Sequence, residues 1–554
     1  MTAMRRHLLP PLLFLFGWLL IETVLFTGCA QIVQPTGGPR DTIPPRLDSL
    51  VSTPNLQTNF EKQRIVLTFD EFLQLKDVLT QVVVSPPLQK RPKVTLHKYS
   101  TVYFDFDPED SLRTDATYTI NFGKAIQDFT EGNPAPIRFV FSTGEYIDSL
   151  KVSALVVDAL TGKPVPDLLV MLYDNLADSV VRTERPFYFG ITDRNGQTVI
   201  ENVKGGAFKA FVLEDLNLNY LYDQAAEGIA FPDSNLTVTD SVLNFISVRF
   251  FREEPALRLD DHEEPYPGLV KLLFNREPYD LEWTPLADSL DWYEKRVADT
   301  TFVWYRQPDS IDWRLVVRQD TLLDTLHITG RSGRTTLEPG LRPAEPANAA
   351  SLRQPLHPAR PIRLAFNHPL QTADTSLIRL LEDTLLTRIP VTAEIDSADH
   401  RVLLLRASWV EELPYELELL PGALTDLLGY ANDTLRRTYK AKKRTDYGNL
   451  QFTLTQLDST GAYVVELNFK DARLQSYQVQ NEAVFTRKLT GLDPGQYSLR
   501  IIEDLNANGR WDPGNYDLRR QPERIFRQTL EEVRANWDVE STVKLEQGSA
   551  PPKQ

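Results

Sequence analysis

The sequence has one cysteine, Cys29, among 554 residues, and only seven histidines. A single cysteine excludes an internal disulfide in any compartment. The histidines do not form a zinc motif such as H-E-x-x-H, and the chain lacks a G-x-S-x-G nucleophile elbow. Adjacent acidic pairs such as Asp260-Asp261 are typical of a solvated surface rather than of an acid–base pair. These absences predict that the protein is not an enzyme.

Basic runs are also absent. The chain has 60 lysines and arginines against 76 aspartates and glutamates, which gives a formal net charge of −16. Nucleic-acid binding requires clustered lysine and arginine to neutralise phosphates. We therefore expect no nucleic-acid partner, and we interpret the acidic balance as an ordinary solvated surface.

The N-terminus contains an apolar run, Leu8–Ile21, that follows two arginines and a histidine. The run is shorter than the roughly 20 residues that span a bilayer, and its two adjacent prolines disfavour a helix. A charged start followed by a short apolar run is typical of a secretory signal peptide. The sequence therefore predicts a signal peptide over residues 1–28.

The segment Leu25-Phe26-Thr27-Gly28-Cys29 ends this run. It resembles a bacterial lipoprotein lipobox, with Phe26 where leucine is usual. The resemblance implies cleavage before Cys29 and acylation of Cys29 by several chains, palmitate among them, and two or more chains anchor a protein stably. Ala30 follows where an aspartate would signal inner-membrane retention, so the outer membrane is favoured, facing either the periplasm or the exterior. The alternative is an ordinary signal peptide beside an incidental cysteine.

Length and composition predict several β domains. A 63.2 kDa chain is too long to fold around a single hydrophobic core, and about four or five domains are expected. Thirty-eight prolines and short alternating apolar segments favour tandem antiparallel β-sandwiches, an all-β fold class. The predicted order is a lipidated tether (29–45), an Ig-like sandwich (46–145), a prealbumin-like sandwich (146–249), a middle sandwich (250–340), a second Ig-like sandwich after a Pro-rich linker (341–446), a second prealbumin-like sandwich (447–545) and a disordered tail (546–554).

The first sandwich has a recognisable pattern. Ile65, Leu67 and Phe69 alternate on one face of a predicted strand. Together with Pro44-Pro45, "IVLTFDEFL", "LRTDATYTINFGKAIQDFTEGN" and the closing "FVFST", this segment resembles the bacterial Ig-like domain of S-layer proteins. That family is a structural and adhesive module without catalytic residues. The strand at 361–370 repeats the pattern of 64–73.

The second sandwich resembles the prealbumin-like, carboxypeptidase-regulatory domain, a non-catalytic stalk. The resemblance rests on "DALTGKPV" after a strand and on the turn at Asn195-Gly196, since Asn-Gly favours a tight hairpin. This unit recurs near the C-terminus, where "EDLNANGRWD" at 503–512 repeats the spacing of "EDLNLNYLYD" at 214–223.

The repeated D-x-N-x-N-x-x-x-D is the strongest chemical signal. Oxygens at alternate positions with a ninth-position carboxylate can wrap a hard cation such as Ca²⁺. Ala226 and Asn515 stand where an EF-hand has its bidentate acid, so any affinity would be weak. The alternative is a turn whose side chains bond the local backbone. The candidate ligands are Asp504, Asn506, Asn508, the Arg510 carbonyl and Asp512, and in the other copy Asp215, Asn217, Asn219 and Asp223.

Tryptophans gather in the middle sandwich. They could form an aromatic platform for sugar rings, or they could fill a small sandwich core, which is the usual place of tryptophan in alternating strands. The four are Trp283, Trp292, Trp304 and Trp313.

These features predict a non-catalytic, lipid-anchored protein of the outer membrane. It would act as a scaffold or accessory subunit of an envelope complex, with an outer-membrane barrel as partner, or as an adhesin. The alternative is a glycan-binding surface lipoprotein that uses the middle domain, and a hydrolase with an unrecognised site is a third hypothesis. No cofactor is expected beyond weakly bound Ca²⁺.

Overall fold

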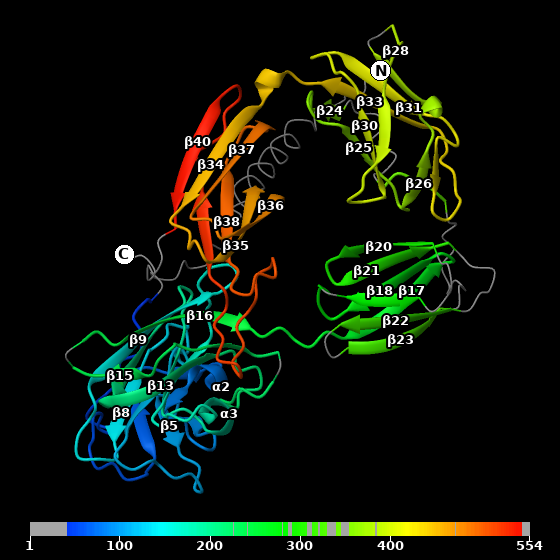
Figure 1. The fold of residues 1–554 in the computed structure, drawn as a ribbon. Helices are drawn as coiled ribbons and strands as arrows, with labels where there is room; N and C mark the ends of the chain where they lie inside the picture. Colours follow the sequence, from blue (N-terminus) through cyan, green and yellow to red (C-terminus); the bar gives the residue numbers. More distant parts are fainter. Residues whose placement is uncertain are drawn as a thin grey trace, which may run out of the picture. The chain divides into compact units, whose positions relative to one another are not determined.

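A computed structural model describes residues 41–545 apart from short stretches between 225 and 471, most of them in the middle domain. The predicted signal peptide, Cys29 and most of the predicted tether lie outside the described residues, as does the predicted tail at 546–554. The chain forms two compact units, residues 1–149 and 150–554, which are described separately (Figure 1). Among the described residues, no helix has the length and apolar character needed to cross a membrane.

The first unit is an antiparallel β-sandwich. The alternation read from the sequence holds, because Ile65, Leu67 and Phe104 are fully buried between the sheets. Tyr118 stacks on Phe141 with ring centroids 5.1 Å apart. The sheets have the orders β1-β5-β4, β3-β6-β8 and β2-β7. The elements are β1 (Ile65–Thr68), β2 (Leu73–Leu75), α2 (Val78–Gln81), β3 (Val83–Ser85), β4 (Lys93–His97), β5 (Thr101–Asp105), β6 (Thr117–Asn121), β7 (Ile126–Asp128) and β8 (Arg138–Ser142).

The second unit begins with residues 150–252. Its first and last strands, β9 and β16, pair in parallel, and the remaining strands pair antiparallel. The Asn195-Gly196 turn precedes β12, and Gly196 has a φ of 69°; an added Cβ there would lie 2.3 Å from the Val156 carbonyl oxygen. The elements are β9 (Leu150–Asp158), β10 (Leu169–Tyr173), α3 (Val180–Thr183), β11 (Tyr188–Ile191), β12 (Gln197–Val203), β13 (Gly206–Leu213), β14 (Gly228–Ala230), β15 (Leu236–Val238) and β16 (Phe245–Arg252).

The middle domain contains two sheets, β17-β18-β21-β20 and β19-β22-β23. Its core includes Val270, Leu272, Val303 and Tyr305, which are supplied mainly by the two central strands of the larger sheet. The strands are β17 (Leu259–Tyr266), β18 (Leu269–Phe274), β19 (Glu282–Pro285), β20 (Trp292–Val297), β21 (Thr300–Tyr305), β22 (Trp313–Gln319) and β23 (Leu322–Ile328).

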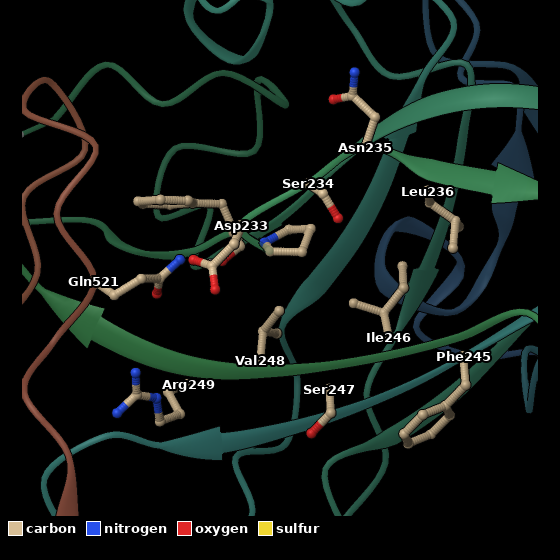
Figure 2. Close-up of a pocket in the computed structure, with 12 residues that line it drawn as sticks. Asp233, Ser234, Asn235, Leu236, Phe245, Ile246, Ser247, Val248, Arg249 and Gln521 are labelled. Carbon is tan, nitrogen blue, oxygen red and sulfur yellow. The ribbon is translucent and has the colours of Figure 1, made fainter. Parts of the chain in front are cut away.

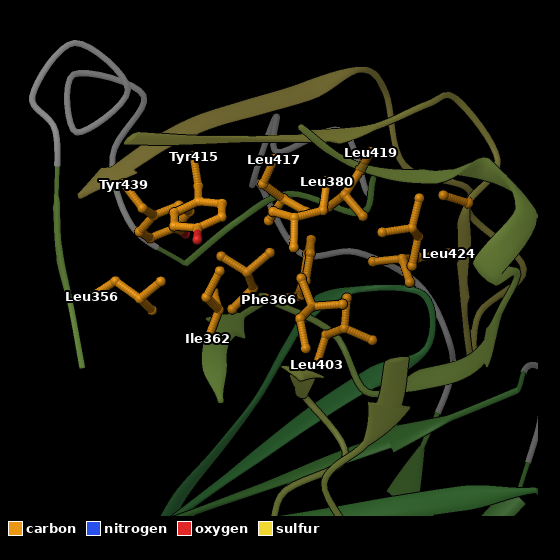
Figure 3. Packing of buried hydrophobic residues seen from close by; sticks show 14 of the residues in the cluster. Leu356, Ile362, Phe366, Leu380, Leu403, Tyr415, Leu417, Leu419, Leu424 and Tyr439 are labelled. Carbon is orange, nitrogen blue, oxygen red and sulfur yellow. The ribbon is translucent and has the colours of Figure 1, made fainter. Parts of the chain in front are cut away.

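The next domain repeats pairings of the first unit. The antiparallel pairs β25/β30 and β26/β32 correspond to β1/β5 and β2/β7. Figure 3 shows its core, where Phe366, Leu380 and Leu417 pack between the layers. The elements are β24 (Gln354–Leu356), β25 (Ile362–Ala365), β26 (Leu370–Ala373), η2 (Thr375–Leu377), β27 (Ile378–Glu382), β28 (Thr387–Ile389), β29 (Thr392–Ile395), β30 (Val402–Arg406), β31 (Pro414–Leu419), β32 (Leu424–Asp426), β33 (Leu435–Ala441) and η3 (Arg444–Asp446).

The last domain again pairs its first and last strands, β34 and β40, in parallel, as β9 and β16 pair. Its sheets have the orders β37-β34-β40 and β36-β35-β38-β39. The described chain is therefore built of β-sandwiches, and the predicted all-β fold class is confirmed. The strands are β34 (Gly448–Thr455), β35 (Ala462–Phe469), β36 (Ala472–Gln480), β37 (Val484–Leu492), β38 (Tyr497–Glu503), β39 (Ile525–Thr529) and β40 (Asp538–Lys544).

Candidate functional site

The second Asp–Asn loop follows β38 and is held by its own side chains. The Asp504 carboxylate accepts hydrogen bonds from the backbone N–H of Asn508 (3.1 Å) and of Gly509 (2.8 Å). Gly509 has a φ of 80°, a left-handed conformation that glycine adopts without strain. The side-chain amides of Asn506 and Asn508 both donate to Asp512 Oδ2, at 2.5 and 2.8 Å. The loop thus closes around the Asp512 carboxylate.

A glutamate that the sequence reading did not include completes this loop. Glu523 accepts from the backbone N–H of Leu505 at 2.8 Å and from that of Asp512 at 2.9 Å, so it bridges the start and the end of the loop. An EF-hand comparison looks for an acid at the twelfth position, which is Asn515. Glu523 lies further along because residues 513–520 intervene, and the sequence signal for it is an acidic residue shortly before the next strand, β39.

The first loop has the same construction after β13. The Asp215 carboxylate accepts from the backbone N–H of Asn219 and of Tyr220, and the Asn219 side-chain amide donates to Asp223. Glu227 accepts from the backbone N–H of Leu216 (3.3 Å) and lies directly before β14, one residue beyond the expected twelfth position. The same bonds therefore occur in both copies. The side-chain amide of Asn217 donates to Asp223, as that of Asn506 donates to Asp512.

The second loop brings three acidic side chains together in a buried place. Asp504, Asp512 and Glu523 are all buried. Burial raises the pKa of Glu523 to about 7; backbone N–H groups oppose this shift, and the nearby Asp512 and Asp504 carboxylates add to it. Asp512 Oδ1 accepts no hydrogen bond and is 3.2 Å from the Arg510 guanidinium.

The loops offer oxygens to a cation but hold their own hydrogen bonds without one. Among the described residues, no group of three or more histidine, cysteine, aspartate or glutamate side chains is arranged to hold a metal ion. The amide N–H groups of Asn506 and Asn508 point at Asp512, the carboxylate that a cation would share. Calcium binding stays a prediction for both loops, and the amides would have to turn for their oxygens to face an ion.

The second loop also contacts the segment that follows β16 and the middle domain. Arg510 lies 3.0 Å from Glu254 and packs over the Tyr279 ring at 3.8 Å. The intervening segment 513–520 adds an ion pair between Arg182 and Asp517 (3.0 Å). These contacts join segments that are far apart in the sequence.

Tyr516 is the centre of this contact. Its ring is buried and meets Phe211, Tyr222 and Phe231 edge-to-face, with centroids 5.5, 6.0 and 5.4 Å away. Its hydroxyl donates to the Asp178 carbonyl oxygen. Edge-to-face rings contribute beyond their buried area. Tyr516 therefore acts as an anchor between two domains.

A groove of ≈ 370 Å³ lies beside this contact (Figure 2). Ser247 and Arg249 of β16 line it, the segment 231–236 covers it, and the side-chain amide of Gln521 donates to the Phe231 carbonyl oxygen at 2.8 Å. The Arg249 Nη1 is buried without a hydrogen-bond partner, and burial lowers the pKa of this guanidinium. The lining offers hydrogen-bond donors to a small polar group and contains no nucleophile–base pair.

The tryptophans of the predicted aromatic platform differ in their exposure to solvent. Trp304 is buried and stacks on Phe302 at 5.7 Å, so it presents no face to a sugar. Trp292 is 41% exposed on β20, an edge strand. The side chains of Trp283 and Trp313 lie outside the described residues. The structure thus leaves Trp292 as the described tryptophan of this domain that a glycan could reach.

Comparison with known proteins identifies one part of the chain. Residues 41–143 match the bacterial Ig-like domain family. The Ig-like resemblance of the first sandwich is confirmed by this match, which covers the first unit and less than half of the chain. No curated protein matches the chain in sequence.

The solved structures that match this chain include the following three proteins. The S-layer protein rSbsC is 9% identical, with 83% of this chain and 65% of that chain covered and a TM-score of 0.15. The Bacillus anthracis TIE protein is 8% identical (92% and 76% covered, TM-score 0.15). The Bacteroides ovatus protein SGBP-B, solved with a mixed-linkage heptasaccharide, is 8% identical (61% and 86% covered, TM-score 0.15). This chain spans about two thirds of the S-layer structure, and likenesses at these scores carry no functional argument.

Proposed function

We propose that this chain is a non-catalytic, lipid-anchored protein of the outer membrane that acts by binding, as a scaffold or accessory subunit of an envelope complex or as an adhesin. The anchor is Cys29, and the proposed partner of a complex is an outer-membrane barrel. The domains are Ig-like or otherwise β-sandwiches, a fold that presents loops and strand edges to partners.

One observation carries this proposal. The loops with the richest chemistry serve structure, because their carboxylates accept hydrogen bonds from backbone and amide N–H groups, and the segment 513–520 beside the second loop holds two domains together through Tyr516. A site used in this way fits a rigid multi-domain binding surface better than it fits catalysis.

The experiment is a pull-down from detergent-solubilised envelope. Metabolic labelling with a palmitate analogue tests the anchor first, and Cys29→Ser is the matched control that should lose the label. Stable co-purification of the wild type with an outer-membrane barrel supports the scaffold function. Recovery of the labelled protein alone contradicts it.

Glycan binding is the second candidate, favoured by the exposed ring of Trp292. On a glycan array, the wild type should bind a defined set of sugars and Trp292→Ala should lose them. Trp537→Ala is the matched control, since Trp537 is also exposed but lies in the last domain. Equal binding by wild type and Trp292→Ala would remove this candidate.

A further inference from the structure

Three aromatic side chains are exposed together on the first unit. Phe72 is 69% exposed, Tyr99 72% and Phe129 66%. The rings of Phe72 and Tyr99 meet edge-to-face, with centroids 6.1 Å apart. Rings that contact each other while facing water are costly to hydrate and mark an interaction surface. We call these three residues the aromatic cluster.

The backbone holds the cluster in place. The Phe129 N–H donates to the Phe72 carbonyl oxygen at 2.8 Å, and the Leu73 N–H donates to the Tyr99 carbonyl oxygen at 2.6 Å. Phe72 precedes β2, Tyr99 lies in the β4–β5 turn, and Phe129 follows β7. Three separate segments are thus joined at one end of the domain, so the rings are presented together before any partner arrives.

The described chain begins beside this cluster. The Asn133 side-chain amide donates to the Asp41 carbonyl oxygen at 3.0 Å, and Asn133 closes the turn that carries Phe129. Asp70, two residues before Phe72, exchanges hydrogen bonds with Arg46. Ile43, between these two contacts, adds a further apolar side chain that is half exposed.

The length of the tether limits how far this end of the domain can lie from the membrane. Eleven residues lie between Cys29 and Asp41, and a fully extended chain of that length reaches at most about 40 Å. A lipid on Cys29 would therefore keep this end of the first unit within that distance of the bilayer. Aromatic side chains favour the headgroup region of a membrane, because a ring has an apolar body and a polarisable face.

The charged residues around the aromatic cluster determine which lipid headgroups it should prefer. Asp41, Asp70 and Glu71 lie at its edge; burial raises the pKa of Glu71, and the carboxylates of Asp70 and Asp41 raise it further. Arg46 and Lys98 are the basic residues beside these segments. Clustered carboxylates are repelled by anionic headgroups, so a zwitterionic surface is the better fit.

We propose that Phe72, Tyr99 and Phe129 insert into the headgroup region of the bilayer that anchors the chain, with zwitterionic lipid as the preferred surface. The inference rests on the proposed lipid anchor. It adds a second contact, which fixes the orientation of the first domain, whereas a single lipid anchor would leave the domain free to turn.

The single cysteine makes a direct test practical. In the lipidated full-length protein Cys29 carries lipid, so Phe129→Cys introduces the one thiol that an environment-sensitive nitrobenzoxadiazole dye can label. Tyr146→Cys is the matched control, because Tyr146 is 73% exposed in the same unit but lies beyond the far end of β8. Both proteins are placed in phosphatidylcholine vesicles carrying a nitroxide-labelled lipid.

Insertion predicts blue-shifted emission and at least twofold stronger nitroxide quenching for the dye at position 129 than at position 146. Replacing half of the lipid by phosphatidylglycerol should reduce that difference. A dye at position 129 that behaves like the control, on protein that floats with the vesicles, overturns the insertion. If the protein does not float with the vesicles, the result contradicts the proposed lipid anchor instead. Labelling at Phe72→Cys gives an independent position if one variant folds poorly.

Discussion

Tyr516→Ala should release the loop that joins the last domain to the first domain of the second unit. The native ring is buried against Phe211, Tyr222 and Phe231, and its hydroxyl bonds the Asp178 carbonyl oxygen. Truncating a buried aromatic residue to alanine costs about 3–5 kcal/mol. Tyr516→Phe keeps the ring and removes one hydrogen bond, at a cost of about 1 kcal/mol.

Native-state hydrogen exchange is the suitable assay, because a multi-domain chain does not unfold in a single two-state step. At about 1.4 kcal/mol per factor of ten, the alanine variant should lose about two to three and a half orders of magnitude of protection across the segment 513–520. The phenylalanine variant should lose about fivefold. Protection in β38 should stay unchanged in both. Equal protection of 513–520 in wild type and Tyr516→Ala would show that the Tyr516 contacts do not stabilise this segment.

Three further predictions concern stability. The pKa of Glu523 is raised from 4.5 to about 7, so the folded state binds an extra proton between these pH values, and roughly 3 kcal/mol of stability is present below pH 4.5 and lost as pH rises to 7. Glu523→Gln should therefore remove the pH dependence of the melting temperature of the last domain over that range. A pH dependence equal to that of the wild type would contradict this. Burial acts to raise the pKa of Asp399, but hydrogen bonds from Arg401 and Lys295 lower it to about 2. About 2 kcal/mol of folding stability is therefore present above pH 3.8 and lost as pH falls to 2. Asp399→Asn should remove this loss of stability in acid, which a series of melting temperatures against pH would measure. Leu417 is fully buried in the core of the domain that contains β25–β33, so Leu417→Ala should cost about 2–5 kcal/mol in a denaturant titration followed by tryptophan fluorescence. Leu385 is exposed, so Leu385→Ala should change little.

The fold could be predicted where local pattern decides it. Alternation at Ile65, Leu67 and Phe69 identified a buried strand face, because one-sided burial imposes a period of two. The Asn195-Gly196 turn was equally readable, since few residues other than glycine adopt its conformation without strain.

The site could be predicted only in part. The Asp–Asn spacing was visible, but Glu523 was not, because an intervening segment moves it away from the position that a motif fixes. The role of Tyr516 was also hidden, since its partners lie in a domain far earlier in the chain and nothing near residue 516 indicates them. Trp304 and Trp292 look alike in sequence, yet one is buried and the other is half exposed.

The parallel pairing of first and last strands has a mechanical consequence. In the last domain, β34 and β40 run side by side from Asn449↔Asp538 to Thr455↔Lys544, so the chain enters at one end of this pair and leaves at the other. The pair β9/β16 has the same arrangement. A force pulling the two ends of such a domain apart loads the whole row of hydrogen bonds in shear, whereas an antiparallel terminal pair would be peeled open one bond at a time. In each of these domains, tension along the chain therefore acts on the terminal strand pair in shear.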